Sequence, residues 1–545
     1  MGLRWERQRP RLHVTMAMRF NRALTGAAIL VAVTVNASRA AADDGPRRGG
    51  VLTYAVVADA PTYDCHAANS FSTIHYLAPH YSTLLRIDPA RYPQVVGDIA
   101  ESWEVGDGGQ TYTFRLRPGI RFHDGSALTA TDVKASFDRI RNPPPGAVSV
   151  RQAQFADVAA VDATDDRTVV FRTKKPNASL LTLLASPWNC IYSAKLMAAN
   201  PDYPAKMVMG SGPFRFVEHV AGSKWVGRRF EGYFRDGLPR LDGFEAYVVS
   251  STALAGALQG GQVMAEFRGI SPAERDGLQK AMGDRIKFQE TVRLTNFQLA
   301  FNTTRKPFDD VRVRRALTLA IDRWAAEPQL RRTTIAGVTG GLLRPGYAMA
   351  RSKQELEQLP GFGSDGAAAK AEARRLLKDA GAENLKFTLT NEAVPNPFAT
   401  IGIYAIDQWR QIGVSVEQET LEASRWNAAR LGGNFDVVVD FVAEFVDEPA
   451  VQLTHYLSHD IAPDNVSRAI DRTLDDIYEK QLRATDLTER AALVHAFEER
   501  VLREAHVAPI SWGYRITPLA AKVMGYITTP SHFLNQDLAE VWLAE

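Results

Sequence analysis

Two residue patterns in the chain have the spacing of known binding chemistry. His455 and His459 lie four residues apart, the spacing of two metal ligands on one face of a helix. No cysteine or further histidine lies near them in the sequence, so we expect no metal. Residues 361–366 read GFGSDG, which matches the dinucleotide-binding pattern GxGxxG and precedes an expected helix. Because Leu359 and Pro360 precede it instead of a buried strand, we expect a loop.

The sequence does not contain the common motifs of hydrolases and nucleotide-hydrolysing enzymes. GxSxG, HExxH, SxxK and the Walker P-loop do not occur, and no histidine lies beside an obvious nucleophile. Cys65 and Cys190 are the only cysteines, which excludes paired-cysteine metal sites. They could form one disulfide in an oxidising compartment, and the sequence leaves their pairing open. We expect no catalytic residues and no cofactor, with a secreted hydrolase as the alternative.

The first 42 residues resemble an export signal. Arg19 and Arg22 precede an uncharged run over residues 23–35, and small residues at 40–42 suit a signal peptidase. The apolar run is shorter than the ~20 residues that a membrane span needs. We therefore expect a signal peptide cleaved near Ala42 and a protein free in the periplasm, since no cysteine near the cleavage point offers a lipid anchor. The true start codon stays open.

Charge and length set the class of protein. The 545 residues carry a net charge of +2, and 45% of them are hydrophobic, enough for two or three lobes with a large core. Residues 1–42 hold seven arginines and one glutamate, so the remaining chain has a net charge of −4. Without a basic excess, we expect no nucleic-acid partner.

Hydrophobic periodicity predicts alternating strands and helices. Residues 51–57 read as a buried strand, and alternation at 112–116 and 120–122 around a Pro118-Gly119 turn predicts a hairpin. Thr129 with Asp132 has the pattern of a capping box that starts a helix. In the second half we expect strands over 294–301, 385–389, 414–416 and 508–512, and helices from Pro307, over 367–380, over 403–411 and over 488–506. The fold class is therefore α/β.

Several segments then resemble one family. Residues 99–105 (IAESWEV), 111–125 (TYTFRLRPGIRFHDG) and 131–137 (TDVKASF) are similar to the signature region of family 5 extracellular solute-binding proteins. These are the dipeptide-, oligopeptide- and nickel-type binding proteins of ABC importers. GSGPF at 210–214, and LAFNT at 299–303 leading to PFDDVRVRRAL at 307–317, agree in order and spacing.

The resemblance implies a periplasmic binding protein-like fold with two lobes around a hinge. Two segments would cross between the lobes, near Thr295 and Ala508. The implied domains are 43–85, 205–295 and 505–545 for lobe I, 86–204 for a subdomain inserted in lobe I, and 296–504 for lobe II. It also implies a monomer that binds a small polar solute, peptide or peptide-like first, and delivers it to an inner-membrane ABC permease with its ATPase. A periplasmic ligand sensor without a transport role is a further alternative.

One segment bears most directly on the ligand. Residues 441–449 read FVAEFVDEP, where peptide-binding relatives carry Trp-x-Ala-Asp-Tyr, whose aspartate pairs with the peptide α-ammonium. Phe441 replaces the tryptophan, Glu444 most nearly matches the aspartate, and the spacing to Pro449 is one residue longer. A carboxylate that pairs with a ligand ammonium is chemically sensible here, because an unpaired charge in a closing cleft would be costly. We predict Phe441 and Glu444, then Asp447, as ligand-binding residues; solvated loop acids are the alternative reading.

The family geometry adds five further cleft candidates, because aromatic rings with polar tips suit a pocket. Asn69, Ser70 and Phe71 follow the first strand, and Trp512 and Tyr514 lie by the second crossing. Core residues of an α/β lobe would look the same. The departure at 441–449 leaves a peptide, an opine, a sugar-like compound and a metal chelate open as ligands.

Overall fold

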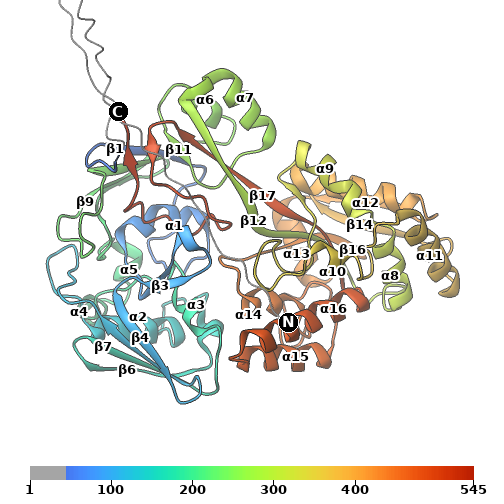
Figure 1. Cartoon of the computed structure of the whole chain (residues 1–545), viewed down its shortest axis with the longest axis horizontal. Helices are drawn as coiled ribbons and strands as arrows, with labels where there is room; N and C mark the ends of the chain where they lie inside the picture. The colour runs from blue at the N-terminus through green and yellow to red at the C-terminus, as the bar shows by residue number, and fades with distance from the viewer. Residues whose placement is uncertain (1–44) are drawn as a thin grey trace, which may run out of the picture. The chain divides into compact units, whose positions relative to one another are not determined.

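The computed structural model describes residues 45–545, so the predicted signal peptide at 1–42 lies outside the described residues. One eleven-stranded sheet extends through two lobes (Figure 1). From edge to edge its strands are β15 (Ser415–Leu421), β14 (Lys386–Glu392), β16 (Val437–Ala443), β12 (Ile286–Phe301), β17 (Val507–Ala520), β11 (Ala265–Glu266), β1 (Val51–Val56), β10 (Gly243–Val248), β9 (Lys224–Arg229) and β8 (Phe214–Val220), with β13 (Ala336–Val338) paired to β17. We call the half with β11 to β8 the first lobe and the half with β16 to β15 the second.

The long strands β12 and β17 connect the lobes. Residues 286–292 of β12 pair with 514–520 of β17 in the first lobe, and residues 295–301 pair with β16 in the second. Between the pairs Val292–Tyr514 and Asn296–Trp512 the register shifts, so residues 293–295 of β12 lie opposite Gly513 alone. We call residues 293–295 the register gap. At Ala508, β17 still lies in the second lobe.

A four-stranded antiparallel sheet belongs to the first lobe. Its order is β4 (Ala100–Gly106), β5 (Thr111–Leu116), β7 (Thr168–Thr173) and β6 (Val158–Asp165), and a short pair β2 (Leu85–Ile87) and β3 (Val95–Gly97) precedes it. The capping box of Thr129 and Asp132 is confirmed at the start of α2 (Ala130–Arg141). The predicted hairpin over 112–122 is wrong, because β5 pairs with β4 and β7 instead. Residues 120–122 contribute only an isolated bridge from Arg121 to Ala127.

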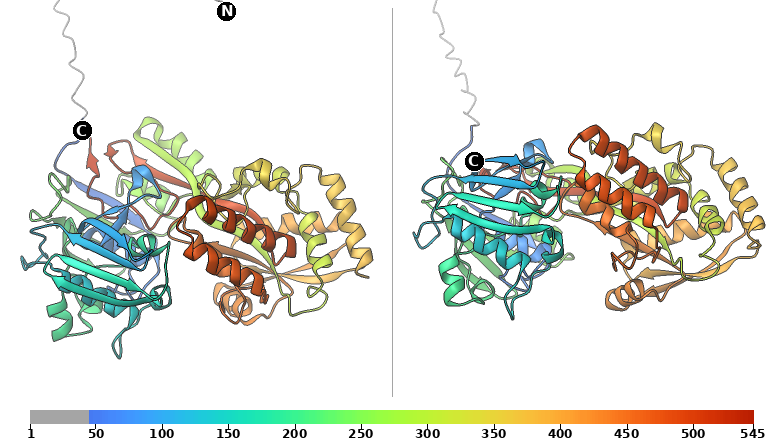
Figure 2. Two further views of the ribbon diagram at one scale, coloured as in Figure 1. Left: turned by 60° about the horizontal axis from the view of Figure 1, so that its bottom comes forward. Right: turned by 90° about the horizontal axis from the view of Figure 1, so that it is seen from below.

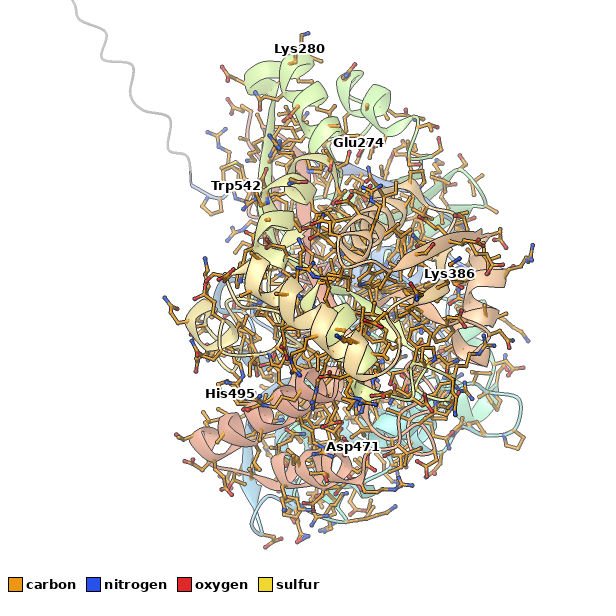
Figure 3. The ribbon with its side chains drawn as sticks, turned by 90° about the vertical axis from the view of Figure 1, so that its right-hand side faces the viewer. Glu274, Lys280, Lys386, Asp471, His495 and Trp542 are labelled. Carbon is orange, nitrogen blue, oxygen red and sulfur yellow. A yellow bond between two sulfur atoms is a disulfide. The ribbon has the colours of Figure 1, made fainter. Side chains whose placement is uncertain are left out.

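Helices cover both lobes (Figures 1 and 2). In the first lobe α7 (Pro272–Met282) begins with a capping box of Ser271 and Glu274, and Lys280 near its other end points away from the lobe in Figure 3. Besides α2 and α7, the helices of the first lobe are α1 (Phe71–Leu77), α3 (Leu180–Leu184), α4 (Ala194–Ala199), α5 (Tyr203–Lys206) and α6 (Leu254–Gln259). Near the chain end β18 (Val523–Met524) pairs with β19 (Trp542–Leu543). Within residues 45–545, no helix has the length and apolar character needed to span a bilayer.

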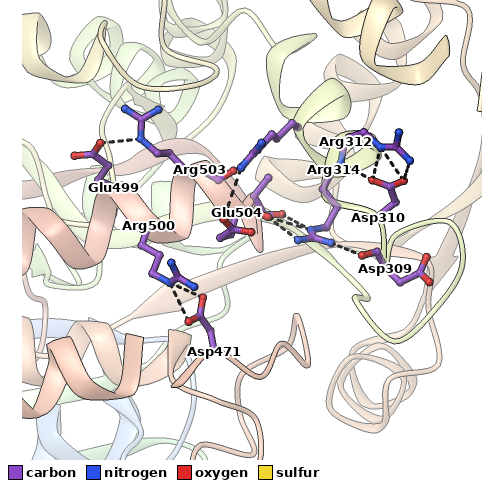
Figure 4. A network of polar contacts seen from close by, with 11 residues as sticks. Asp309, Asp310, Arg312, Arg314, Asp471, Glu499, Arg500, Arg503 and Glu504 are labelled. Atoms are coloured by element: carbon purple, nitrogen blue, oxygen red, sulfur yellow. Dashed lines mark hydrogen bonds and ion pairs between the residues drawn. The ribbon is translucent and has the colours of Figure 1, made fainter. Parts of the chain in front are cut away.

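The second lobe contains nine α-helices among the described residues. They are α8 (Val311–Leu319), α9 (Arg323–Thr333), α10 (Lys353–Leu356), α11 (Gly366–Asp379), α12 (Thr400–Arg410), α13 (Ala423–Gly432), α14 (Pro449–Gln452), α15 (Arg472–Arg483) and α16 (Leu487–Glu504). Residues 361–365 form the loop predicted before a helix, and α11 begins at Gly366. Arg314 joins α8 to the end of α16 by donating to the Glu504 carbonyl at 2.7 Å, and Arg500 binds Asp471 at 2.8 Å (Figure 4).

Each lobe has its own hydrophobic core, and successive residues of the central strands β16 and β17 are buried, so both faces of these strands are covered. Trp225 and Phe114 lie in the first core, and Trp409 and Leu317 lie in the second. Phe445 follows β16 of the second lobe yet packs into the first core, with its ring 6.3 Å from Trp188. The segment after β16 therefore contributes a packing contact between the two lobes.

Candidate functional site

Two adjoining cavities lie where the lobes meet. The first, which we call the hinge cavity, has a volume of about 220 Å³ and is lined by all three residues of the register gap. The second has a volume of about 290 Å³, and we call it the Trp188 cavity because the Trp188 side chain lines it. Four lining residues are common to both cavities: Asn69, Ala443, Glu444 and Phe533. Both mix aromatic and charged side chains, as sites for small polar ligands do.

The first lobe supplies Asn69 and Ser70 from the loop before α1 and Phe71 from the first position of α1, and these three residues line the hinge cavity together. Ser70 caps α1 by accepting a hydrogen bond from the Thr73 backbone N–H at 3.3 Å. Just before this loop, Cys65 forms a disulfide with Cys190, which answers the question left open by the sequence. The site loop is thus fixed at both ends.

Arg151 also holds the segment that precedes Asn69. Its guanidinium donates to the carbonyls of Cys65 at 2.5 Å and Ala68 at 2.8 Å. It also lies 5.5 Å from the ring centroid of Trp188, and both side chains line the Trp188 cavity. Burial lowers the pKa of Arg151 to about 10, so the group stays charged at neutral pH.

The second lobe contributes the end of β16. Phe441 lines the hinge cavity and stacks parallel to Trp426, with 6.2 Å between ring centroids. The Glu444 backbone N–H donates to the carbonyl of Leu294 in the register gap at 3.4 Å. Phe441 and Glu444 are therefore brought together with Asn69, Ser70 and Phe71 around one cavity, and each of these five was predicted from the sequence as a ligand contact.

The Glu444 carboxylate is part of an ion triad. His455 lies 2.7 Å from Glu444 through Nε2 and 2.9 Å from Asp464 through Nδ1. Burial opposes protonation of the imidazole, but the hydrogen bonds and charges of Asp464 and Glu444 raise the pKa of His455 to about 10. The triad thus holds an imidazolium between two carboxylates, with a net charge of −1. The helical face that His455 and His459 would share does not form, because His459 lies beyond the short helix Leu453–Tyr456 and contacts the Asn465 carbonyl at 3.1 Å.

Asp447 lies between the lobes but lines neither cavity. Its side chain is fully buried and pairs with Arg344 at 2.7 Å, while its backbone N–H donates to the Tyr92 hydroxyl at 2.9 Å. Burial raises the pKa of Asp447, and the Arg344 guanidinium opposes this shift. Asp447 therefore holds a contact between the second lobe and the first.

Trp512 and Tyr514 also lie outside the lining of both cavities. The Trp512 indole is 2% exposed and donates to the Gly341 carbonyl at 3.0 Å. The Tyr514 ring lies under Arg331 at 4.7 Å and its hydroxyl bonds to Glu290. The two aromatic residues flank Gly513 in the crossing strand.

Sequence reasoning missed the arginines of the hinge cavity, Arg268 and Arg293. Arg268 follows the two-residue strand β11, and Arg293 occupies the register gap. Neither belongs to a motif of the predicted signature. Their only sequence signal is a basic residue next to strand residues, which is common on a solvated face.

A sheet shared by two lobes through two long strands, with polar cavities between the lobes, defines a two-lobe solute-binding protein. The model of bacterial extracellular solute-binding proteins, family 5, matches residues 94–463, and the chain belongs to this family. The glutathione-binding protein GsiB of Salmonella typhimurium is 28% identical over 387 residues, 70% of this chain and 71% of that protein.

Solved structures agree with this fold. The periplasmic binding protein DppA of Helicobacter pylori, in complex with the peptide STSA, has a TM-score of 0.76 at 24% identity, covering 92% of this chain and 99% of that one. CtaP of Listeria monocytogenes, an ABC transporter substrate-binding protein, has a TM-score of 0.79 at 23% identity, covering 92% and 100%. The α/β two-lobe class predicted from the sequence is confirmed, and the family and these relatives are binding proteins.

Proposed function

We propose that the protein is the periplasmic substrate-binding component of an ABC importer. It binds a small, peptide-like solute in the hinge and Trp188 cavities and delivers it to an inner-membrane permease with its ATPase, without chemical conversion. The observation that carries the proposal is the meeting of Asn69, Ser70 and Phe71 with Phe441 and Glu444 around the hinge cavity. A ligand held between groups of both lobes favours the closed form over the open form.

Glu444 is the group proposed to receive a ligand ammonium. It lines both cavities, and the triad with His455 and Asp464 keeps a net charge of −1. A cation beside Glu444 would therefore neutralise a charge that the protein leaves uncompensated in the triad. The names of the relatives, which include a glutathione-binding protein and a complex with the peptide STSA, support a peptide-like ligand.

Calorimetry on the purified mature chain tests this proposal with glutathione, dipeptides and tripeptides. We expect saturable binding at one site, with every ligand recovered unchanged by mass spectrometry. Glu444→Gln should weaken binding of an ammonium-bearing ligand about tenfold or more, as expected for a charge-assisted hydrogen bond. Glu383→Gln, an exposed change in the second lobe, is the matched control. Turnover of a peptide or ester, or equal binding by Glu444→Gln and the control, would contradict the proposal.

A further inference from the structure

The hinge cavity contains two arginine side chains whose charges the described protein does not pair. Neither Arg268 nor Arg293 has a carboxylate within 4.0 Å of its guanidinium among residues 45–545. The Arg268 guanidinium lies 4.4 Å from the ring centroid of Phe71, so the ring orients it without neutralising it. Nε of Arg293 is buried and has no hydrogen-bond partner within the same residues.

Glu266, a buried carboxylate of the first lobe whose charge acts on both Arg268 and Arg293, already accepts hydrogen bonds from the backbone. Glu266 accepts hydrogen bonds from the backbone N–H groups of Arg268 at 2.8 Å and Gly269 at 2.7 Å. A third guanidinium, Arg515, is buried and donates to the Thr529 carbonyl at 2.6 Å and to other backbone carbonyls. Arg268 and Arg293 line the cavity, and Arg515 and Glu266 act on them electrostatically from outside its lining, so three guanidiniums and one carboxylate leave a net positive charge in this group.

The histidines nearby add no compensating charge. Burial, with neighbouring arginines, lowers the pKa of His75 to about 3 and lowers that of His532 well below its usual range, so both rings are neutral. Burial, followed by repulsion from Arg268 and Arg515, lowers the pKa of Arg293 to about 9. An arginine with a buried unpaired nitrogen is costly unless an anion completes its hydrogen bonds.

We propose that Arg268 and Arg293 form a carboxylate-binding subsite of the hinge cavity and select ligands that carry a free carboxylate. This inference rests on the proposed solute-binding function and deepens it. The planar guanidinium fork matches a carboxylate bidentately, which a lysine at either position would not do. Because Glu444 lines the same cavity, a zwitterion such as a short peptide or glutathione finds a partner for each charge.

Four ligands test the subsite by calorimetry: glutathione, its diester, a tripeptide, and the C-terminal amide of that tripeptide. The wild-type chain should bind each free acid about 10- to 100-fold more tightly than its masked partner, the range of a charge-assisted interaction. Arg268→Gln and Arg293→Gln should each lose most of this preference, by weakening the acids while leaving the masked ligands unchanged. Arg425→Gln, an exposed change on α13, is the control and should keep the full preference.

The outcomes separate this subsite from the proposed function. If the wild-type chain binds acids and masked ligands equally, or if both variants keep the preference, the subsite is overturned while solute binding stands. If none of the four ligands binds, the peptide-like ligand class fails, and the subsite fails with it. A purely structural role for the arginines would weaken acids and masked ligands by the same factor, and that result also overturns the subsite. Unchanged unfolding midpoints confirm that the variants fold.

Discussion

Ser179 of the first lobe contacts the ion pair of Glu448 and Arg490 in the second lobe. It precedes α3 in the first lobe, and its hydroxyl donates to Oε1 of Glu448 at 2.9 Å and accepts from Nη2 of Arg490 at 3.0 Å. Glu448 and Arg490 belong to the second lobe and are paired with each other. All three side chains are buried, and none of them lines the hinge or Trp188 cavity.

The substitution Ser179→Ala removes the two hydrogen bonds that the Ser179 hydroxyl makes to the second lobe and leaves the ion pair of Glu448 and Arg490 in place. A hydrogen bond to a charged group contributes about 1.5–3 kcal/mol, of which water regains part when the lobes separate. We therefore expect the closed form to lose about 1–2 kcal/mol relative to the open form. Ligand affinity should fall about 5- to 30-fold, because binding must then restore the closed form.

Calorimetry with a ligand found for the wild-type chain measures this loss, and small-angle X-ray scattering of the ligand-free protein should show a larger radius of gyration. Ser250→Ala, an exposed change in the first lobe, is the matched control. The reasoning is refuted if Ser179→Ala binds within twofold of the control. It is also refuted if affinity falls while the ligand-free and ligand-bound scattering curves stay those of the wild type.

Three further predictions concern stability. The pKa of His455 is raised from 6.5 to about 10. The contribution of His455 to the free energy of unfolding is therefore complete below pH 6.5 and is lost as the pH rises through 10. Because solvent screens this partly exposed group, we expect His455→Gln to remove about 2 kcal/mol of the pH-dependent free energy of unfolding, measured in urea. If the free energy of unfolding depends on pH as in the wild type, the pairing of His455 with Glu444 and Asp464 is refuted. Replacing Cys65 and Cys190 by serine should cost about 2–4 kcal/mol, and a reductant should then have no further effect on the unfolding midpoint. Trp409→Phe should cost about 1–3 kcal/mol in the second lobe without altering ligand affinity in calorimetry, since the indole donates to the Leu317 carbonyl at 2.9 Å.

Local signals in the sequence predict the elements whose formation depends on neighbouring residues. The capping box of Thr129 and Asp132, and Gly381 with its positive φ just after α11, act within one or two turns, so the predicted positions of those helices agree with the structure. The hairpin at 112–122 fails because alternation reports which face of a strand is buried and does not identify its partner. The partner β4 is largely exposed and reads as polar.

The site depends on distances that the sequence does not encode locally. Cys65 and Cys190 are 125 residues apart, and their pairing follows from the packing of the whole first lobe. Arg268 and Arg293 meet because a loop after β11 and a shift in the register of β12 face the same cavity. The family resemblance could indicate Phe441 and Glu444, whereas no motif points to the two arginines.

The register gap has a consequence for how the protein senses its ligand. Arg293, Leu294 and Thr295 lie where β12 passes from one lobe to the other, and the same three residues line the hinge cavity. Leu294 receives a hydrogen bond from Glu444 and gives one to the Pro530 carbonyl, so its peptide groups join the two lobes. The hinge residues between the lobes therefore also line the hinge cavity. If the proposed ligand occupies the hinge cavity, we expect its contacts with residues 293–295 to influence directly the angle between the lobes, whereas a ligand confined to the Trp188 cavity would act through contacts with the lobes alone.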